Sequence, residues 1–273
     1  MKNLLKCAVY DVKQGTVKRY RIYILAILLY FLWAMNAYSE LHNGYQDITL
    51  GDIAVKLFFG VKIYIKGMEI QIPYIFLVCT AFFGLSIGNY VTEDYRNMGV
   101  LHIIRYRDKK VWWYGKCIWN IWHTLLMYLA VFSGIFLFGC LIRSLSWNIS
   151  PQLSQYLEYP ILNKDTGLLF AYLLGLGIVY IMTCNQIQIT LQMIFGTTAA
   201  YAVYLANFVL SVCFYNKFLP GNYGMLCRTK IFQEDGVEIG FGIPFLLVLW
   251  IIAVIVGKYY VDRRDLLVMD RDN

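Results

Sequence analysis

Residues 166–216 read TGLLFAYLLGLGIVYIMTCNQIQITLQMIFGTTAAYAVYLANFVLSVCFYN and carry no charged side chain over 51 positions. As one helix, this run would be about 76 Å long at a rise of about 1.5 Å per residue. The hydrocarbon core of a bilayer is about 30 Å thick, so the run is expected to cross it twice. Two spans are therefore predicted, at 166–185 and 188–214. The predicted turn is marked by polar residues near the middle of the run: Asn185, Gln186, Gln188, Thr190 and Gln192.

Four shorter uncharged runs surround this one. Because a charge at the bilayer centre costs about 2.5–3.5 kcal/mol, such runs locate further spans. These spans are predicted at about 21–38, 72–91, 114–142 and 239–258. The composition agrees, since 59% of residues are hydrophobic and 15% are charged, whereas soluble domains carry about 25% charged residues. We therefore predict an all-α integral membrane protein with six transmembrane helices in a single domain, 1–273, and exclude a soluble enzyme or a disordered chain.

The positive charges are unevenly distributed around these spans. Sixteen of the 24 Lys and Arg residues lie before the first span, in the 92–117 loop or in the C-terminal tail. Loops rich in Lys and Arg face the cytoplasm, so both termini are expected there. The net charge of +7 is thus interpreted as a topology signal. A nucleic-acid partner is not expected, because the basic residues are divided among three segments.

Several segments outside the spans have helical patterns. Residues 1–20 place apolar side chains on one face and charges on the others, which predicts an amphipathic helix lying on the membrane interface. Gly15 is a candidate end for this helix. On the outer side, apolar residues between Leu50 and Phe58 repeat at helical spacing and predict a short interfacial helix. Residues 217–238, just before the last span, could dip back toward the membrane.

The loop between the second and third spans is TEDYRNMGVLHIIRYRDKKVWWYGKC, residues 92–117. It begins with acidic residues, continues with a short apolar patch and ends with basic residues. A flexible connector needs no apolar patch, so this order favours a short amphipathic element onto which another protein docks. The alternative is a helix that rests on lipid headgroups.

No catalytic, cofactor or metal site is expected in the chain. It lacks a phosphate-binding loop and the sequence patterns of zinc hydrolases and serine hydrolases. His123, Asn120 and Asn207 lie within predicted spans, where such side chains usually form hydrogen bonds between helices. The predicted spans carry Asp, Glu, Lys or Arg only near their ends, at Arg21, Lys116 and Lys258, so ion coupling is not indicated either. The chain is therefore either passive or driven by energy from another protein.

At this point the sequence resembles the permease subunit of a type-2 ATP-binding-cassette (ABC) exporter, of the kind common in Firmicutes. The resemblance covers roughly residues 1–268, with individually loose motifs in the family's order. They are Gly88-Asn89-Tyr90 followed by LHIIRYRDKKVWWYGKCIWN at 101–120, Leu50-Gly51-Asp52 with Phe58-Phe59-Gly60, PGNYGMLCR at 220–228, and YYVDRRDL at 259–266.

This resemblance implies a six-span permease with an N-terminal interface helix, a coupling helix in the first cytoplasmic loop and short extracellular or re-entrant helices before the last span. ATP and Mg would be bound by separate cytoplasmic ABC ATPase subunits. The other implied partners are a second copy or a related permease, membrane lipids, and a peptide, antibiotic or lipid-like cargo. The location would be the bacterial plasma membrane. The coupling helix would be Glu93–Ile104, and the coupling residues would be Glu93, Asp94, Arg96, Met98, Leu101, Ile104, Arg105 and Arg107.

Two other functions are alternatives. A membrane-embedded enzyme would need an acid–base pair within the spans, and only His123 is a candidate. A non-transporting immunity or scaffold protein could bind a cationic antimicrobial peptide through the acidic residues of the outer segments, which are otherwise ordinary solvated charges.

Overall fold

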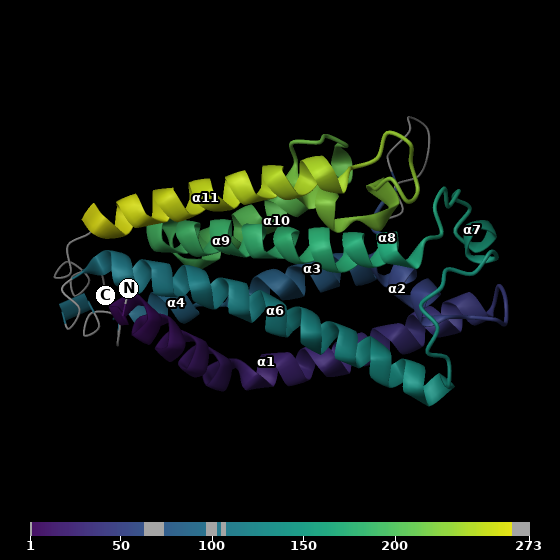
Figure 1. Cartoon of the computed structure of the whole chain (residues 1–273), viewed down its shortest axis with the longest axis horizontal. Coiled ribbons are helices and arrows are strands. Elements are labelled where there is room, and N and C mark those ends of the chain that lie inside the picture. Colours follow the sequence, from purple (N-terminus) through teal and green to yellow (C-terminus); the bar gives the residue numbers. More distant parts are fainter. Residues whose placement is uncertain (1, 63–73, 97–102, 105–107, 264–273) are drawn as a thin grey trace.

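The computed structural model describes residues 2–62, 74–96, 103–104 and 108–263. Every named element in these ranges is helical (Figure 1), which confirms the predicted all-α class. The elements are α1 (Lys2–His42), α2 (Leu50–Phe58), α3 (Tyr74–Ile87), α4 (Tyr90–Asp94), α6 (Lys109–Ile142), α7 (Leu153–Tyr156), α8 (Thr166–Phe170), the π-helix η2 (Ala171–Leu176), α9 (Gly177–Phe195), α10 (Thr197–Cys213), the 3-10 helices η3 (Pro220–Gly224) and η4 (Leu226–Arg228), and α11 (Ile239–Arg263).

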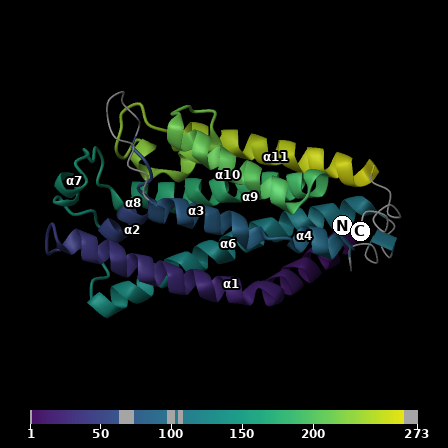
Figure 2. The same ribbon diagram turned by 180° about the vertical axis from the view of Figure 1, so that it is seen from behind.

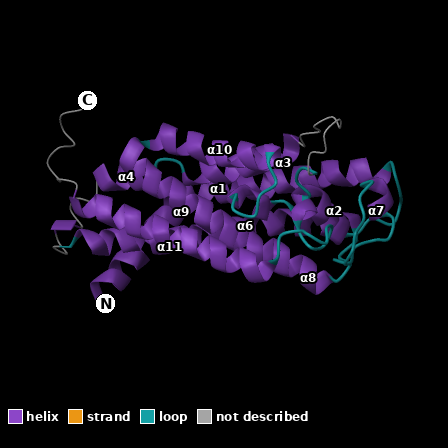
Figure 3. Cartoon of the chain, turned by 90° about the horizontal axis from the view of Figure 1, so that it is seen from above, coloured by secondary structure: helices purple, strands orange, loops and turns teal. Residues whose placement is uncertain are grey.

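The long helices form one elongated bundle. Helices α1, α6 and α10 run in one direction along it, and α3, α9 and α11 run in the other (Figures 1 and 2). The beginnings of α1 and α6, the whole of α4 and the end of α11 lie together, at what we call the α4 end. There the Lys109 ammonium donates a hydrogen bond to the Asp262 carbonyl oxygen at 3.3 Å. Helices α2, α7 and α8 lie at the opposite, α2 end, where most loops of the described part gather (Figure 3).

Five helical stretches of the described residues are long and apolar enough to cross a membrane. Helix α10 is also apolar but shorter, with 17 residues, so the six-span count stays a prediction. Large apolar side chains cover the outer faces of the bundle, where Leu28 and Ile255 are 56% and 59% exposed. A contiguous apolar surface of this kind is typical of a membrane-embedded protein. The stretches are Asn3–His42, Ile75–Asp94, Lys109–Ile142, Thr166–Phe195 and Ile239–Arg263.

The turn predicted at 185–192 is wrong. Helix α9 continues through these residues to Phe195, and the chain turns at Gly196, whose φ of +86° glycine adopts without a steric penalty. The polar side chains of α9 are buried because neighbouring helices supply their hydrogen-bond partners. For example, the Thr190 hydroxyl donates to the Ala253 carbonyl oxygen of α11 at 3.0 Å. These residues therefore hold the bundle together instead of facing water in a loop.

The predicted interface helix is not a separate element. Helix α1 runs without a break for 41 residues, through Gly15. A side chain at Gly15 would place its Cβ 2.1 Å from the indole nitrogen of Trp119 in α6. The glycine therefore allows α1 to approach α6 closely and does not end the helix.

The predicted helix at 50–58 is confirmed as α2. The Thr49 hydroxyl accepts from the Asp52 backbone N–H at 3.1 Å, and the Asp52 carboxylate accepts from the Thr49 N–H at 3.2 Å, which makes a capping box. The Asp52 carboxylate also accepts from the backbone N–H and the hydroxyl of Ser150. Most of α2 is buried, so it packs within the bundle. The segment before α11 contains two short helices, η3 and η4, and its re-entry into the membrane stays a prediction.

The Arg228 side chain caps the C-terminus of α10, which lies at the α2 end of the bundle. Its guanidinium is fully buried and donates to the carbonyl oxygens of Ser211 and Val212, in the last turn of α10, and to Val61. It also donates to the Asn222 side-chain oxygen. Burial lowers the pKa of this guanidinium, because it removes the charge from water. The negative end of the α10 dipole and four oxygen acceptors offset that cost.

Candidate functional site at the α4 end

The α4 end contains a buried ion network. The Lys116 ammonium of α6 lies 2.5 Å from the Asp11 carboxylate of α1 and 2.6 Å from the Asp94 carboxylate of α4. The three side chains are 0–3% exposed. The Trp112 indole N–H also donates to Asp94 at 3.0 Å. One ammonium therefore joins three helices, of which α4 leads directly into the loop that precedes α6.

The local sequence explains how Lys116 becomes buried. The Asp108 carboxylate accepts a hydrogen bond from the Lys110 backbone N–H and caps α6. The helix thus begins five residues before the predicted span boundary at 114, and Lys116 lies two turns inside it. Its ammonium also lies 4.8 Å from the centre of the Tyr90 ring. A buried charge is tolerated only when it is paired and hydrogen-bonded, as it is here.

A second buried cation, Arg19 of α1, lies near the same aromatic ring, that of Tyr90. Its guanidinium carbon is 5.6 Å from the centre of the Tyr90 ring and 6.0 Å from that of Trp119. Tyr90, the first residue of α4, is therefore within cation–π distance of both Arg19 and Lys116. The Arg19 guanidinium also donates to the Ser86 carbonyl oxygen, in the last turn of α3. Arg19 therefore contacts the helices on both sides of the break between α3 and α4.

Gly88 and Asn89 form that break, which we call the hinge. Gly88 has a φ of +48°, in the left-handed region that residues with a Cβ adopt at a cost of about 1–2 kcal/mol. Two glutamines of α9 hold the hinge in place. The Gln188 amide donates to the Gly84 carbonyl oxygen at 2.9 Å, and the Gln192 amide donates to that of Gly88 at 2.7 Å. Helix α4 is therefore held at its start by the hinge contacts and at its end by the ion network.

His123 binds two neighbouring helices to α6. The Ser86 hydroxyl donates to the Phe83 carbonyl oxygen at 2.6 Å, so it accepts from His123 Nε2–H at 2.9 Å. Nδ1 is then the acceptor for the Tyr23 hydroxyl at 2.8 Å. The imidazole is fully buried and both of its nitrogens are used. These contacts are those of an interhelical hydrogen-bonding group, as the sequence suggested.

The two predicted asparagines differ in their surroundings. Asn120 is fully buried, and its amide donates to the Met182 carbonyl oxygen and the Gln186 side-chain oxygen, at 3.0 and 3.1 Å. It therefore connects α6 with α9. Asn207 of α10 is half-buried, and its carbonyl oxygen accepts from the Ser211 hydroxyl at 2.8 Å. It lies away from the α4 end.

The predicted coupling residues fall into three groups. Glu93, Arg96 and Ile104 are exposed at the α4 end, and the Ile104 side chain is 62% exposed. Asp94 is buried in the ion network. Because Ile103 is buried beside Ile104, the segment packs one apolar side chain inward and presents the next to the outside. The remaining predictions lie outside the described residues: Met98, Leu101, Arg105 and Arg107.

Sequence reasoning missed Asp11, Arg19 and Lys116. From the sequence, Arg19 and Lys116 count among the flanking basic residues that set topology, because a charge is taken to end a span. Asp11 is assigned to the charged faces of the predicted interface helix. The only available signal was the helical register, which places Lys116 four residues after Trp112 and thus on the same face of α6. The register does not reveal the partner, which lies 105 residues earlier in the sequence.

Among the described residues, no group of three or more His, Cys, Asp or Glu side chains could hold a metal ion. No protein-family model, curated protein or solved structure matches the chain. The structure therefore describes a helical bundle with an apolar outer surface, the mark of a membrane-embedded protein, and a buried ion network beside a hinge.

Proposed function

We propose that this chain is the transmembrane subunit of an ATP-driven ABC exporter, with ATP hydrolysis on separate cytoplasmic ATPase subunits. Two permease subunits, identical or related, would form the pathway in the plasma membrane of a bacterium, with both termini in the cytoplasm. The cargo would be a peptide, an antibiotic or a lipid-like compound. The loop 92–112 would couple the ATPase to the helices.

The observation that carries this proposal is the way the loop is attached to the bundle. Asp94 at the beginning of the loop and Lys116 beyond its end are joined by an ion pair, and Asp11 extends the pair to α1. A displacement of the loop would therefore reach α1 and α6 together, while the Gly88 hinge would let α4 move relative to α3. This is the kind of two-state element that ligand binding on a partner can bias.

Co-purification tests the proposal most directly. The tagged chain, solubilised in a mild detergent, is expected to retain a protein with an ATP-binding cassette, and the complex is expected to hydrolyse ATP. Recovery of the chain without an ATPase, from cells that are resistant to a cationic peptide only when they express it, would support an immunity protein instead and contradict an exporter.

A pair of variants separates coupling from folding. Ile104→Asp places a charge on the exposed residue of the coupling segment, and Leu162→Asp makes the same change at the α2 end, where Leu162 is 50% exposed. Ile104→Asp is expected to reduce ATPase retention or cargo-stimulated hydrolysis several-fold, and Leu162→Asp is expected to leave both unchanged. Equal effects of the two variants would remove the coupling role from this segment.

A further inference from the structure

Three amide side chains on one face of α9 each have a buried oxygen that lacks a hydrogen-bond donor in the described part of the chain. Asn185, Gln188 and Gln192 are 1–2% exposed and follow one another at spacings of three and four residues. Residues at these spacings lie on the same face of a helix. The side-chain oxygen of each is buried and accepts no hydrogen bond from the described residues. A buried acceptor left without a donor costs about 1–3 kcal/mol.

The orientation of these amides is fixed by their donors. The Gln188 and Gln192 nitrogens face the carbonyl oxygens of Gly84 and Gly88, which can only accept. The side-chain oxygens of both glutamines must therefore point elsewhere. No rotation of either amide group would satisfy both of its ends within these contacts.

Asn185 is oriented less strictly, because its partner is a hydroxyl, which can donate as well as accept. The Thr124 hydroxyl donates to the Asn120 side-chain oxygen at 3.5 Å, so it accepts from the Asn185 amide nitrogen, at 3.3 Å. By contrast, the oxygen of Gln186, on another face of α9, accepts from the Asn120 amide at 3.1 Å. Gln186 is thus a matched glutamine whose oxygen is satisfied by protein.

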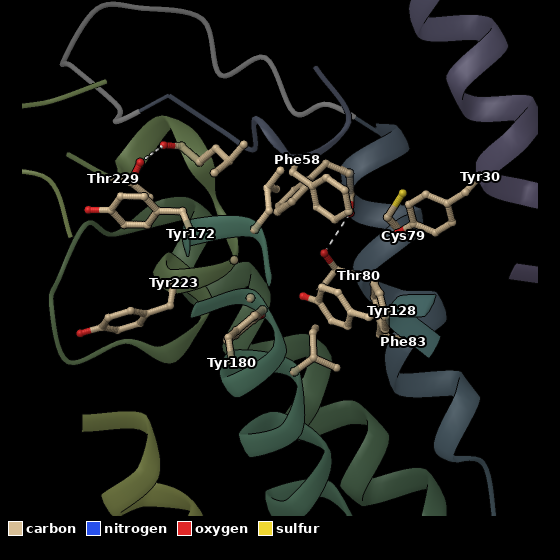
Figure 4. A pocket seen from close by; sticks show the side chains of 16 residues that line it. Tyr30, Phe58, Cys79, Thr80, Phe83, Tyr128, Tyr172, Tyr180, Tyr223 and Thr229 are labelled. Atoms are coloured by element: carbon tan, nitrogen blue, oxygen red, sulfur yellow. Dashed lines mark hydrogen bonds between the residues drawn. The ribbon is translucent and has the colours of Figure 1, made fainter. Parts of the chain in front are cut away.

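The same face of α9 leads to a cavity nearer the α2 end. The cavity has a volume of about 30 Å³, which is room for one or two water molecules. Figure 4 shows Tyr128 and Thr80 on one side of it and Tyr180 of α9 on the other. Gly177 and Ile181, the preceding positions on this face, also line it. The cavity and the three amides thus lie along one face of α9, which we call the seam and which extends about 22 Å from residue 177 to residue 192 at 1.5 Å per residue. On α9 the cavity is lined by Gly177, Tyr180 and Ile181, and the three amides follow further along the helix.

The hydrogen-bonding groups and charges along this seam determine which kind of ligand can bind there. The amide oxygens require hydrogen-bond donors, which excludes an apolar molecule. Among the described residues that line the cavity or bond to the three amides, none is a carboxylate. The Arg19 guanidinium, which donates to Ser86 next to the hinge, disfavours a cation. A neutral donor that fits a space of this size is water.

We propose that buried water molecules in the seam donate hydrogen bonds to the side-chain oxygens of Asn185, Gln188 and Gln192, and that water also occupies the tyrosine-lined cavity. Buried waters of this kind satisfy polar groups that the protein leaves unpaired. Water at Gln188 and Gln192 lies next to the hinge, where it can replace the glutamine contacts with Gly84 and Gly88 when α4 moves. The site does not depend on the proposed transport function.

Nuclear magnetic resonance of the full chain in lipid nanodiscs tests this site. Glutamine side-chain amides labelled with ¹⁵N in a deuterated protein report nearby water through NOESY and ROESY cross-peaks at the water frequency. Gln188→Met, Gln192→Met and Gln186→Met each remove one amide signal and so assign it. The deciding spectrum is that of the unsubstituted protein. A variant that fails to fold therefore affects only the assignment, which Gln→Asn variants can then supply because they keep a neutral amide.

Water cross-peaks several-fold stronger at Gln188 and Gln192 than at Gln186 are the expected result. The exposed Gln152 is the positive control. Water cross-peaks as weak at Gln188 and Gln192 as at Gln186 would overturn the proposal. Cross-peaks from lipid or detergent in place of water would overturn it as well.

Discussion

The ammonium of Lys116 lies 2.6 Å from the carboxylate of Asp94, so the last residue of α4 is paired with the third turn of α6. The pair joins the two helices that flank residues 95–108. Asp11 contacts the same ammonium, so two carboxylates share Lys116. The stability of the α4 end should therefore respond unequally to the loss of each partner.

Lys116→Met should be the most destabilising change in the ion network. It removes the ammonium that two buried carboxylates share, and breaking a buried pair in this way typically costs about 3–5 kcal/mol. Asp94→Asn and Asp11→Asn each leave one intact pair and should cost less. Thermal unfolding of the purified chain, followed by circular dichroism, measures the order. Glu93→Gln, at an exposed position, is the control, and a Lys116→Met protein as stable as this control would contradict the assignment.

Gly88→Ala should destabilise the chain by about 1–2 kcal/mol through its positive φ alone. An added Cβ would also lie 3.0 Å from an Arg19 guanidinium nitrogen. Gly240→Ala has neither restriction and is the control. Gly196→Ala has open space around it, but its φ of +86° with a ψ of 169° is a conformation that is essentially restricted to glycine. The melting temperatures of Gly88→Ala and Gly196→Ala are therefore both expected to fall below that of Gly240→Ala. A neutral Gly88→Ala would show that the break between α3 and α4 can be formed without the left-handed conformation.

Arg228→Met should lower stability by several kcal/mol, because four oxygen acceptors would lose a buried, charged donor. Arg228→Lys should recover only part of the loss, since an ammonium cannot reach all four acceptors with the geometry of a guanidinium. Urea or thermal unfolding of both variants measures this difference. Lys230→Met, which removes an exposed cation two residues away, should change little. A Lys variant as stable as the native protein would mean that charge alone suffices at this position.

Because the Cys227 thiol is buried, we expect the folded protein to lose stability in alkaline solution. Burial raises its pKa from an ordinary value near 9.0 to about 12, while the thiol donates a hydrogen bond to the Val61 carbonyl oxygen. Since the folded pKa is the higher one, the contribution to stability is complete below about pH 9 and is lost as the pH rises toward 12. The melting temperature of Cys227→Ala should therefore fall less than that of the native protein over this range. Equal slopes would contradict a buried neutral thiol.

Labelling in whole cells tests the predicted orientation. In a background without reactive native cysteines, Lys110→Cys at the α4 end should be protected from an impermeant maleimide, and Lys164→Cys at the α2 end should react. The reason is the excess of Lys and Arg in the segments assigned to the cytoplasm. Labelling of Lys110→Cys from outside, in cells with an intact membrane, would reverse the topology.

Much of the fold could be predicted from the sequence, because long uncharged runs have few alternatives to helix in an apolar environment. The capped helix at Leu50–Phe58 was also found from its spacing. The turn at 185–192 was placed wrongly because polarity does not distinguish a side chain that faces water from one that faces another helix. Only the carbonyl oxygens of α3 and α11, which lie far away in the sequence, decide between the two.

The candidate site was harder to predict for a related reason. A basic residue beside an apolar run is usually a boundary, and Lys110 fits that rule as an exposed residue in the first turn of α6. Lys116 does not, because Asp11 and Asp94 compensate its charge inside the bundle. The compensation is a tertiary contact and leaves no local pattern. For the same reason, Gly15 was interpreted as a helix end when it is a contact point for Trp119.

The unbroken course of α1 has a practical consequence for anyone who handles this protein. Trimming the first twenty residues, or fusing a bulky tag to them, would not remove a dispensable appendage. It would take away or strain the turn that carries Asp11, and Lys116 would be left with one carboxylate in place of two. Affinity tags and truncations at this terminus should therefore be regarded as core mutations, and purification handles belong elsewhere on the chain.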